Sequence, residues 1–400
     1  MFTVDGQYNS ATIYTDDIEP EAISQIIQFC NQPTFAESKI RIMPDVHAGA
    51  GCTVGTTMTI KDKVVPNIVG VDIGCGMLVA EFGKVDIDPI ILDETIHKYV
   101  PAGFEIRETE HKFIEKIHIN ELLCNEIDSD RAYKSIGTLG GGNHFIELDT
   151  DDDGNKYLVI HSGSRRLGQE VAKYYQKTAF KDLSNKFGRN KRDAIIKRCK
   201  AENKKRDIEV ELKELAKIRP ENFNSDFAYC EGVLFDNYIH DMKIMQEFAV
   251  YNREAILDTI CSNMGLTIVN KFCTLHNYID MDAMILRKGA VSAQKDERLI
   301  IPMNMRDGSL ICIGKGNPEW NYSAPHGAGR LLSRSKAKEQ ILLEDFEASM
   351  NGIYTTSISY ATIDEAPMVY KPMQEIIDNI GDTVTIEKII KPLYNFKAGD

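Results

Sequence analysis

The stretch Ile136–Leu148, with the sequence IGTLGGGNHFIEL, constrains the fold of this chain more than any other. Its run of glycines at 140–142 would weaken regular structure by roughly 0.5–1 kcal/mol per residue relative to alanine. Such a run indicates that another group approaches the backbone closely. The residues that follow are Asn143, His144, Phe145 and Glu147. Together they can hold a metal and a nucleotide, although a glycine-rich turn that enters a strand beside a hydrogen-bonded histidine explains them too.

The composition is that of a globular protein with room for one or two hydrophobic cores. Of 400 residues, 43% are hydrophobic and 27% are charged. No leading signal pattern and no run of eighteen uncharged apolar residues occurs, so we expect a cytoplasmic protein without a membrane span. The nine cysteines form no CxxC pair, which favours reduced thiols over disulfides or a zinc ribbon.

Charge is distributed unevenly along the chain. The net charge at pH 7 is −13, which by itself argues against nucleic acid as a partner. Segment 171–206, however, holds thirteen lysines and arginines against three acidic residues. It lies in a charged, helix-forming stretch at about 169–215. We expect a solvated pair of basic helices there that attracts a polyanion backbone.

Hydrophobic periodicity predicts a mixture of helices and strands along the rest of the chain. Helices are predicted at 19–31, at 86–100 with the stretch beyond it, and at 231–264. Strands are predicted at 39–43, 64–71, 156–161, 283–291, 297–303 and 309–314. Neither an internal repeat nor a linker divides the chain, so we expect a single interwoven α+β domain over residues 1–400.

A second glycine-rich turn, VGVDIGCGM, frames a carboxylate and a thiol. Asp72 and Cys75 stand three residues apart, between glycines at 70, 74 and 76. A buried, inert cysteine is the usual alternative, but buried cysteines seldom occupy turns of this kind. An exposed sulfur with an acidic neighbour favours a metal ligand.

The nine histidines fall into two groups. Those at 97, 111, 118 and 240 lie in charged helical sequence, and we expect the first three to be surface residues and His240 to be structural. The others lie in glycine-rich turns at strand ends: His47, His144, His161, His276 and His326. With Asp72 and Cys75 they suffice for two metal ions and a spare imidazole. Ligand softness alone favours zinc, and sequence chemistry leaves the metal open.

Taken together, the motifs resemble those of the RNA-splicing ligase RtcB family, in order and over nearly the whole chain. They are MPDVHAGAG, GVDIGCGM, LGGGNHFIE, HSGSR, HNY, RKGA, PHGAGRLLSR and a lysine close to the C-terminus. The resemblance implies an α+β fold of that family's own type, with central β-sheets surrounded by helices. It also implies an enzyme that uses GTP and Mn²⁺ to join an RNA 3′-phosphate or 2′,3′-cyclic phosphate to a 5′-hydroxyl.

Residue by residue, the resemblance assigns two manganese ions, with a shared cysteine thiolate, to Asp72, Cys75, His144, His161 and His276. It makes His326 the nucleophile that takes GMP and Asp45 the residue that holds its ring. The implied nucleotide contacts are Asn143, Phe145, Glu147, Ser309, Gly327, Ala328, Gly329 and Lys397. Arg165 and Arg334 would grip RNA phosphates, and His47 would lie beside the centre without binding metal.

Several departures from the family pattern bear on the nucleotide and RNA contacts. The chain reads PMNM at 302–305 where many members have PGSM, and Ala50 replaces a lysine. HSGSRR stands in place of a lone Arg–Gly, and the chain ends in KAGD rather than in Lys–Gly. None of these departures falls on the implied metal ligands or on His326.

Two other functions stay open. A dinuclear metallophosphoesterase would use a similar set of Asp, His and Asn ligands, but a hydrolase activates water and has no use for a spare imidazole. An RNA-binding module without catalysis would need only the basic segment. The sequence specifies neither the RNA, nor tRNA splicing as against repair, nor the need for an activating protein partner. We expect a monomer.

Overall fold

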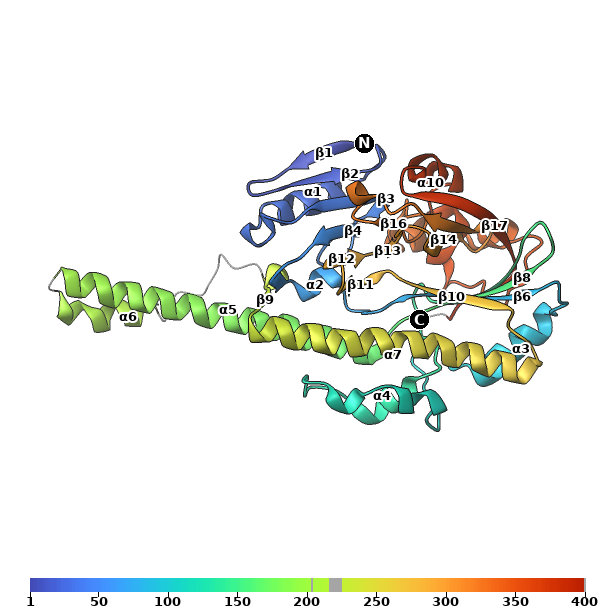
Figure 1. Cartoon of the computed structure of the whole chain (residues 1–400), viewed down its shortest axis with the longest axis horizontal. Coiled ribbons are helices and arrows are strands. Elements are labelled where there is room, and N and C mark those ends of the chain that lie inside the picture. The colour runs from blue at the N-terminus through green and yellow to red at the C-terminus, as the bar shows by residue number, and fades with distance from the viewer. Residues whose placement is uncertain (203, 216–224, 399–400) are drawn as a thin grey trace.

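Two large β-sheets form the centre of the molecule, and helices lie against them (Figure 1). A computed structural model describes residues 1–202, 204–215 and 225–398. The fold is α+β, as the motifs imply. The last two residues of the KAGD ending lie outside the described part of the chain.

The first sheet has the strand order β1-β2-β3-β4-β12-β11. Its strands are β1 (Phe2–Asp5), β2 (Ser10–Ile13), β3 (Ile40–His47), β4 (Val54–Thr59), β12 (Ile285–Lys288) and β11 (Asn277–Asp280). β2 and β3 run parallel, and the other neighbours are antiparallel. The register between β3 and β4 shifts between Ile42 and His47, so the end of β3 that carries Asp45 leaves the regular ladder.

The second sheet is antiparallel, in the order β10-β6-β8-β7-β17-β15-β14. Its strands are β10 (Asn270–Leu275), β6 (Gly76–Gly83), β8 (Lys156–Ser162), β7 (Phe145–Thr150), β17 (Val384–Phe396), β15 (Gly308–Gly314) and β14 (Arg298–Asn304). Two short pairs complete the strands: β13 (Ala290–Ser292) with β16 (Ser323–Pro325), and β5 (Lys63–Val64) with β9 (Cys230–Glu231).

The α-helices are α1 (Pro20–Cys30), α2 (Pro66–Val69), α3 (Pro89–Tyr99), α4 (Ser129–Ser135), α5 (Arg165–Ala201), α6 (Ile208–Leu215), α7 (Val233–Met264), α8 (Arg334–Gln340), α9 (Leu343–Ser349) and α10 (Met373–Ile380). The predicted helices at 19–31, 86–100 and 231–264 are thus confirmed as α1, α3 and α7. The predicted strands at 39–43, 156–161, 297–303 and 309–314 are confirmed as parts of β3, β8, β14 and β15.

Two strand predictions are wrong, and each error has a local cause. The run 64–71 forms only the last residue of β5 before α2 begins, because Pro66 has the fixed φ that suits the first turn of a helix. The run 283–291 is broken into β12 and β13 at Gly289, which has a φ of +60°. A Cβ there would lie 2.1 Å from Val54 Cγ1, so only glycine lets the chain turn at this point.

The helices predicted beyond residue 100 are mostly replaced by 3₁₀ turns, at Lys112–Lys116 and Ile119–Glu121. His97 and His118 are exposed, as predicted, but the prediction of a surface position for His111 is wrong. His111 is buried because its Nδ1 accepts the Phe113 amide at the start of the first of these turns, and its ring packs edge-on against Phe113.

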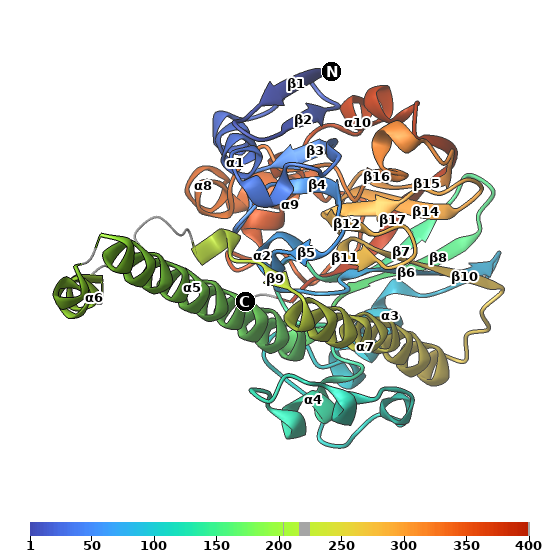
Figure 2. The same cartoon turned by 60° about the vertical axis from the view of Figure 1, so that its left-hand side comes forward.

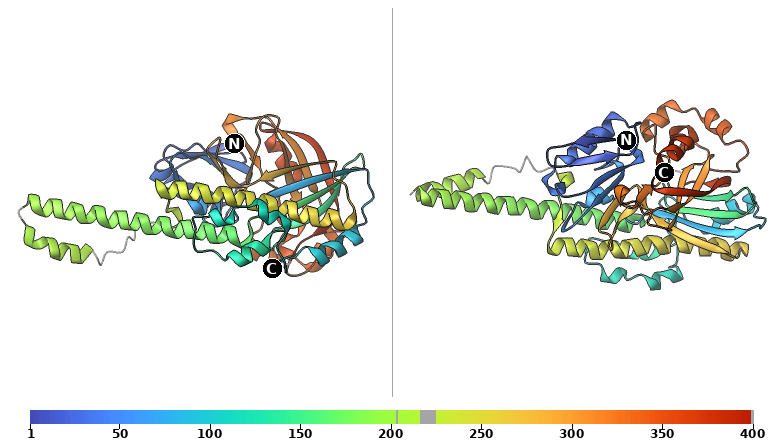
Figure 3. Two further views of the ribbon diagram at one scale, coloured as in Figure 1. Left: turned by 60° about the horizontal axis from the view of Figure 1, so that its bottom comes forward. Right: turned by 45° about the horizontal axis from the view of Figure 1, so that its top comes forward.

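The basic segment forms an arm that leaves the body of the molecule (Figures 1 and 2). The first half of α5 is packed through Leu167, Val171, Tyr175 and Leu183, whereas most side chains between 185 and 198 are at least partly exposed. α6 folds back along α5 and is joined to it by the Arg198–Glu211 ion pair. Both further views show the arm pointing away from the sheets (Figure 3). Asn203 lies outside the described residues.

α7 runs under the second sheet and joins it to the arm (Figure 1). Tyr238, Met242, Met245 and Phe248 are fully buried in the core that α7 shares with α5 and α2. Ile256 and Ile260, further along the helix, pack into a separate core beneath β6, β7 and β8. No helix in the described part of the chain is long and apolar enough to cross a membrane.

Phe248→Ala should lower the free energy of unfolding by about 3–5 kcal/mol, because it leaves a cavity in the core that joins α7 to α5. Lys243→Ala, at an exposed position of the same helix, should change it by less than about 0.5 kcal/mol. Urea unfolding followed by far-ultraviolet circular dichroism measures both. Equal effects of the two substitutions would contradict a core at this position.

Candidate metal and nucleotide site

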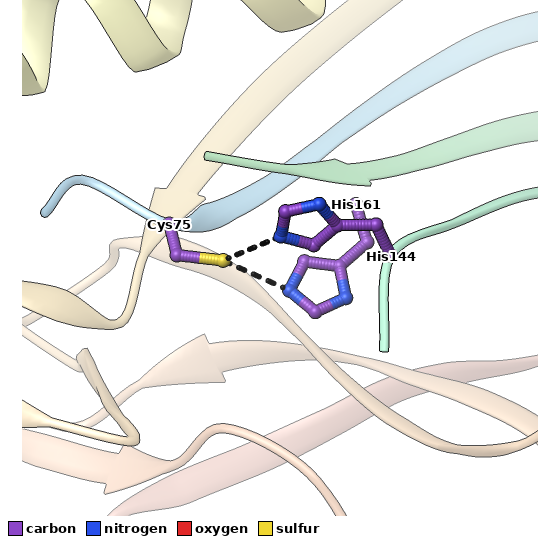
Figure 4. A group of neighbouring side chains, drawn as sticks. All are labelled: Cys75, His144 and His161. Carbon is purple, nitrogen blue, oxygen red and sulfur yellow. Dashed lines mark hydrogen bonds between the residues drawn. The ribbon is translucent and has the colours of Figure 1, made fainter. Parts of the chain in front are cut away.

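The turn between α2 and β6 presents Asp72 and Cys75 to the centre of the molecule. Gly74 has a φ of +73°, and a Cβ on it would lie 2.9 Å from the Cα of Gln246, so this turn rests directly on α7. Cys75 is buried. Its Sγ lies 3.2 Å from His161 Nε2 and 3.5 Å from His144 Nε2 (Figure 4).

Two of the histidines are oriented by main-chain carbonyl groups. The Nδ1 of His144 lies 2.9 Å from the Leu139 oxygen, and the Nδ1–H of His161 donates to the Asn143 oxygen at 3.1 Å. Because a carbonyl only accepts, Nδ1 of His161 carries the proton and its Nε2 keeps a lone pair. His144 also has Asp72 next to its Nε2 and Arg165 next to its Nδ1, so its Nε2 keeps a lone pair only in the tautomer that donates to Leu139. The antiparallel register supports this arrangement, since His161 on β8 lies between Met77 on β6 and Phe145 on β7.

The remaining predicted ligands complete the cluster. The Oδ2 of Asp72 lies 3.0 Å from His144 Nε2, and His276 Nε2, from the turn between β10 and β11, lies 3.3 Å from His161 Nε2. Burial lowers the pKa of His161 and His276 well below the usual value, so both rings are neutral at pH 7. The predicted five residues therefore meet at one place, with the sulfur between the Asp72–His144 pair and the His161–His276 pair.

The chemistry of this donor set fits a cation. The donor atoms of Cys75, His144 and His161 all lie within 4.8 Å of one another. Burial and the neighbouring Asp72 raise the pKa of the Cys75 thiol well above its usual value. The Nδ1 of His276 is buried and has no hydrogen-bond partner among the described residues. Nitrogen lone pairs that face one another in a buried site favour a positive charge between them.

His326 lies next to this cluster and is held by a different kind of group. Its ring centroid is 4.9 Å from that of His276. The Oδ2 of Asp45, which is fully buried on β3, accepts from His326 Nδ1 at 2.7 Å and from the amides of His326 and Gly327. Three donors on one oxygen fix the carboxylate and the ring together. Nε2 of His326 is therefore the nitrogen left with a lone pair.

A cavity of about 440 Å³ opens beside His326 and His161. Most of the predicted nucleotide contacts line it: Asn143, Phe145, Glu147, Gly327, Ala328, Gly329 and Lys397. Ser309 is the exception. It is fully buried on β15 and does not line the cavity, and its hydroxyl has no partner within the described chain.

The inner end of the cavity combines an aromatic ring with ionisable groups. Lys397 Nζ lies 5.3 Å from the centre of the Phe145 ring and 2.7 Å from Glu365 Oε2. Burial raises the pKa of Glu147 to about 7, and the side-chain amide of Asn395 donates to its carboxylate. These groups can offer a planar base a stacking surface and hydrogen-bond acceptors.

Sequence reasoning missed Glu365, which joins the cations of this cavity. Arg330 Nη1 lies 3.2 Å and Arg334 Nη1 3.1 Å from its Oε1, and Lys397 and the Tyr370 hydroxyl contact its Oε2. Burial opposes ionisation, but Lys397 and the two arginines bring the pKa of Glu365 down to about 2. The stretch IDEAPMVYKP contains it, and the pair of acidic residues between apolar ones before Tyr370 was the available signal.

The two predicted RNA contacts lie in different cavities. Arg334 lines the first, whereas Arg165 lines a second one of about 430 Å³ together with Asp72, His144 and Arg131. Asn143 lines both, so both cavities adjoin this residue, which directly precedes the candidate ligand His144. Arg165, at the first turn of α5, lies 3.2 Å from His144 Nδ1.

The sequence departures and His47 also border the first cavity. Met303, Asn304 and Ala50 line it, and Lys288 Nζ donates to the Ala50 carbonyl at 2.5 Å. His47 lines it too, but its Nδ1 donates to the Asp45 main-chain oxygen, and burial lowers its pKa to about 4. Within the described chain, no hydrogen bond joins His47 to the five-residue cluster.

Comparison with known proteins places this arrangement in a family. A family model described as tRNA-splicing ligase RtcB matches residues 25–128 and 117–398. RNA-splicing ligase RtcB1 of Escherichia coli strain ATCC 25922 and RNA-splicing ligase RtcB of strain K12 are each 30% identical to the chain, over 92% of both proteins. A tRNA-splicing ligase RtcB of Aeropyrum pernix is 26% identical over 92% of this chain and 90% of its own. The chain belongs to the tRNA-splicing ligase RtcB family.

Proposed function

We propose that this chain joins RNA 3′-phosphate or 2′,3′-cyclic phosphate ends to 5′-hydroxyl ends, using GTP and Mn²⁺ and a guanylate carried on His326. As a member of the family it is an RNA ligase. The names of its relatives support splicing of RNA or tRNA as the setting, and sealing of broken RNA would use the same chemistry. One observation carries the finer proposal: a buried carboxylate holds His326 beside the donor cluster and the larger cavity.

The donor cluster would hold two Mn²⁺ ions. The distances favour Asp72, Cys75 and His144 around one ion and Cys75, His161 and His276 around the other, with the thiolate shared. The choice of Mn²⁺ follows the family, because thiolate and imidazole ligands alone suit zinc as well. Bound in this way, the ions would neutralise phosphate charge and polarise phosphoryl oxygens.

The first cavity would hold GTP with its base at the inner end. Phe145 offers the base a ring face, and Glu147 offers acceptors to the N–H groups on the edge of guanine. Asn143, which lines both cavities, would contact the phosphates. Lys397 and the arginines around Glu365 supply positive charge along the same wall.

His326 would act as the nucleophile of the first step. Asp45 fixes the proton on Nδ1, so Nε2 attacks the α-phosphorus of GTP. A P–N bond forms, and the bond from that phosphorus to the bridging oxygen of pyrophosphate breaks. The buried carboxylate stabilises the positive charge that the ring acquires.

The guanylate then activates the RNA end. A terminal phosphate monoester is a poor electrophile, because its oxygens are charged and oxide would have to leave. An oxygen of the RNA 3′-phosphate displaces His326 from the guanylate phosphorus and forms an anhydride. The 5′-hydroxyl attacks the RNA phosphorus, loses its proton and expels GMP, leaving a 3′,5′-phosphodiester. A 2′,3′-cyclic phosphate needs prior opening by water.

Positive charge near the two cavities would guide RNA to the centre. Arg165 and Arg334 lie in the separate cavities that adjoin Asn143, which supports one RNA end in each. α5 begins at Arg165 and continues into the arm, so the basic surface starts at the centre itself. A nonspecific attraction of the RNA backbone to the arm would raise the local concentration of ends.

Cys75→Ala should remove most of the bound metal and lower sealing by more than about a hundredfold, because one substitution takes a ligand from both proposed ions. Cys30→Ala, at a buried cysteine of α1, is the matched control and should keep the bound metal and the sealing activity. Elemental analysis of purified protein and a sealing assay measure the two effects. Full metal content in the Cys75 variant would refute the ligand assignment.

His326→Ala should abolish labelling of the protein by radioactive GTP with Mn²⁺, yet retain sealing of an RNA that already carries a 3′-guanylate. His326 is needed only to carry GMP to the RNA, so the last step does not use it. His47→Ala, in the same cavity, should still become labelled.

Labelling of the His326 variant would move the nucleophile elsewhere, with His47 next to test. Equal failure on capped and uncapped RNA would instead make His326 a structural residue or a metal ligand. If the wild-type protein hydrolyses phosphoesters and does not become labelled by GTP, the result would favour the dinuclear phosphoesterase.

Neutralising exposed lysines of the arm should weaken RNA binding without changing protein labelling by GTP. The variant replaces Lys181, Lys191, Lys197 and Lys200 with glutamine. A control replaces exposed lysines elsewhere: Lys61, Lys84, Lys243 and Lys295. The slope of log affinity against log salt should fall by ~0.7 for each arm lysine that contacts phosphate. Unchanged binding at low salt would exclude the arm as a docking surface.

A further inference from the structure

Two adjacent polar residues of α7, Asn252 and Arg253, are fully buried beneath the candidate metal site. A buried arginine or asparagine is costly unless its hydrogen bonds are made. Their partners are main-chain and side-chain groups of the turns that carry the candidate ligands. Sequence reasoning assigned no role to either residue.

Arg253 joins the turn of Cys75 to the strand of His161. Its Nη1 donates to the Gly74 carbonyl at 3.0 Å and to the Ser162 carbonyl at 2.6 Å. Gly74 directly precedes Cys75, and Ser162 directly follows His161. One guanidinium nitrogen thus bridges the peptide groups next to two ligands of the proposed shared site. Its Nη2 donates to Cys273 Sγ at 3.3 Å, on β10.

Asn252 joins the strand of His161 to the turn that leads to His144. Its Oδ1 accepts the amides of Gly137 and Thr138, and its Nδ2 donates to the Ser162 hydroxyl oxygen at 2.9 Å. The Ser162 hydroxyl donates in turn to the Leu139 carbonyl at 2.8 Å. That carbonyl is the one that orients the His144 ring.

We propose that Asn252 and Arg253 are positioning residues that set the spacing of the Cys75, His144 and His161 turns. This inference rests on the proposed function, in which those three residues hold metal. The planar guanidinium suits the task because its donors are fixed relative to one another, whereas an ammonium group is a flexible point donor. α7 supplies a rigid base, since the Gly74 turn lies against its backbone without room for a Cβ.

The test is titration of metal-free protein with Co²⁺, followed by the sulfur-to-cobalt charge-transfer absorption that reports the Cys75 contact. Arg253→Lys should weaken Co²⁺ binding by about ten- to a hundredfold and shift this band, as loss of a group that orients a ligand does. Arg287→Lys is the matched control. Arg287 is also fully buried, but its hydrogen bonds go to Ser323, Tyr278, Asp280 and the carbonyls of 321 and 322.

The control variant should lose stability to urea as Arg253→Lys does, yet keep the wild-type cobalt affinity and spectrum. Wild-type affinity in Arg253→Lys would overturn the proposal, and so would equal weakening in both variants. If Arg253→Lys does not fold, the Co²⁺ affinity of Asn252→Ala is compared with that of the control instead. Wild-type Co²⁺ affinity in Asn252→Ala would then overturn the proposal. Failure of the wild-type protein to bind Co²⁺ would refute the metal centre itself, which separates that outcome from the others.

Discussion

The candidate site depends on one electrostatic constraint: a sulfur and three imidazoles are buried within contact of one another, and their lone pairs need a positive charge. The register of the second sheet brings these donor atoms together. It places His161 between Met77 and Phe145, and Cys75 directly precedes the neighbouring strand β6. The carbonyl groups of Leu139 and Asn143 lie at Nδ1 of His144 and His161, so Nε2 of each ring faces the cluster. These contacts fix the rings without a bound ion, which would lower the cost of ordering them around a cation.

The orienting partner separates the roles of neighbouring histidines. Neutral carbonyl oxygens lie at Nδ1 of His144 and His161, so Nε2 of each ring is the atom that faces the cluster and could bind a metal. A buried carboxylate holds His326, and it would stabilise positive charge on this ring in the proposed nucleotidyl transfer. His276 and His326 lie with ring centroids 4.9 Å apart, yet only the second has such a counter-charge. From the sequence, the roles of His276 and His326 could be distinguished only through the family resemblance, because both residues follow strand ends near glycine.

Much of the fold and most of the site were predictable from local patterns. Glycine-rich turns at strand ends identified Asp72, Cys75, His144 and His161, since few other reasons place glycine there. Interactions that depend on distant segments were not predictable. Arg253 and Asn252 stand in ordinary helical sequence, and only the packing of α7 brings them to the ligand turns. Ser309 has the expected residue type, but β15 directs it into the interior rather than into the cavity.

Glu365 resolves how an acidic chain can present positive charge to a polyanion. With a net charge of −13, the whole protein repels RNA at long range, so attraction has to be local. Without a counter-charge, Arg330, Arg334 and Lys397 would repel one another at the cavity wall. The buried carboxylate holds them together, and its low pKa keeps it ionised across the physiological range. Asp364 pairs with Arg334 as well, at 2.6 Å, so two carboxylates together fix these cations along the wall where phosphates would bind. The arm repeats this arrangement at the surface, where Glu211 pairs with Arg198 while exposed lysines beside them stay available to solvent.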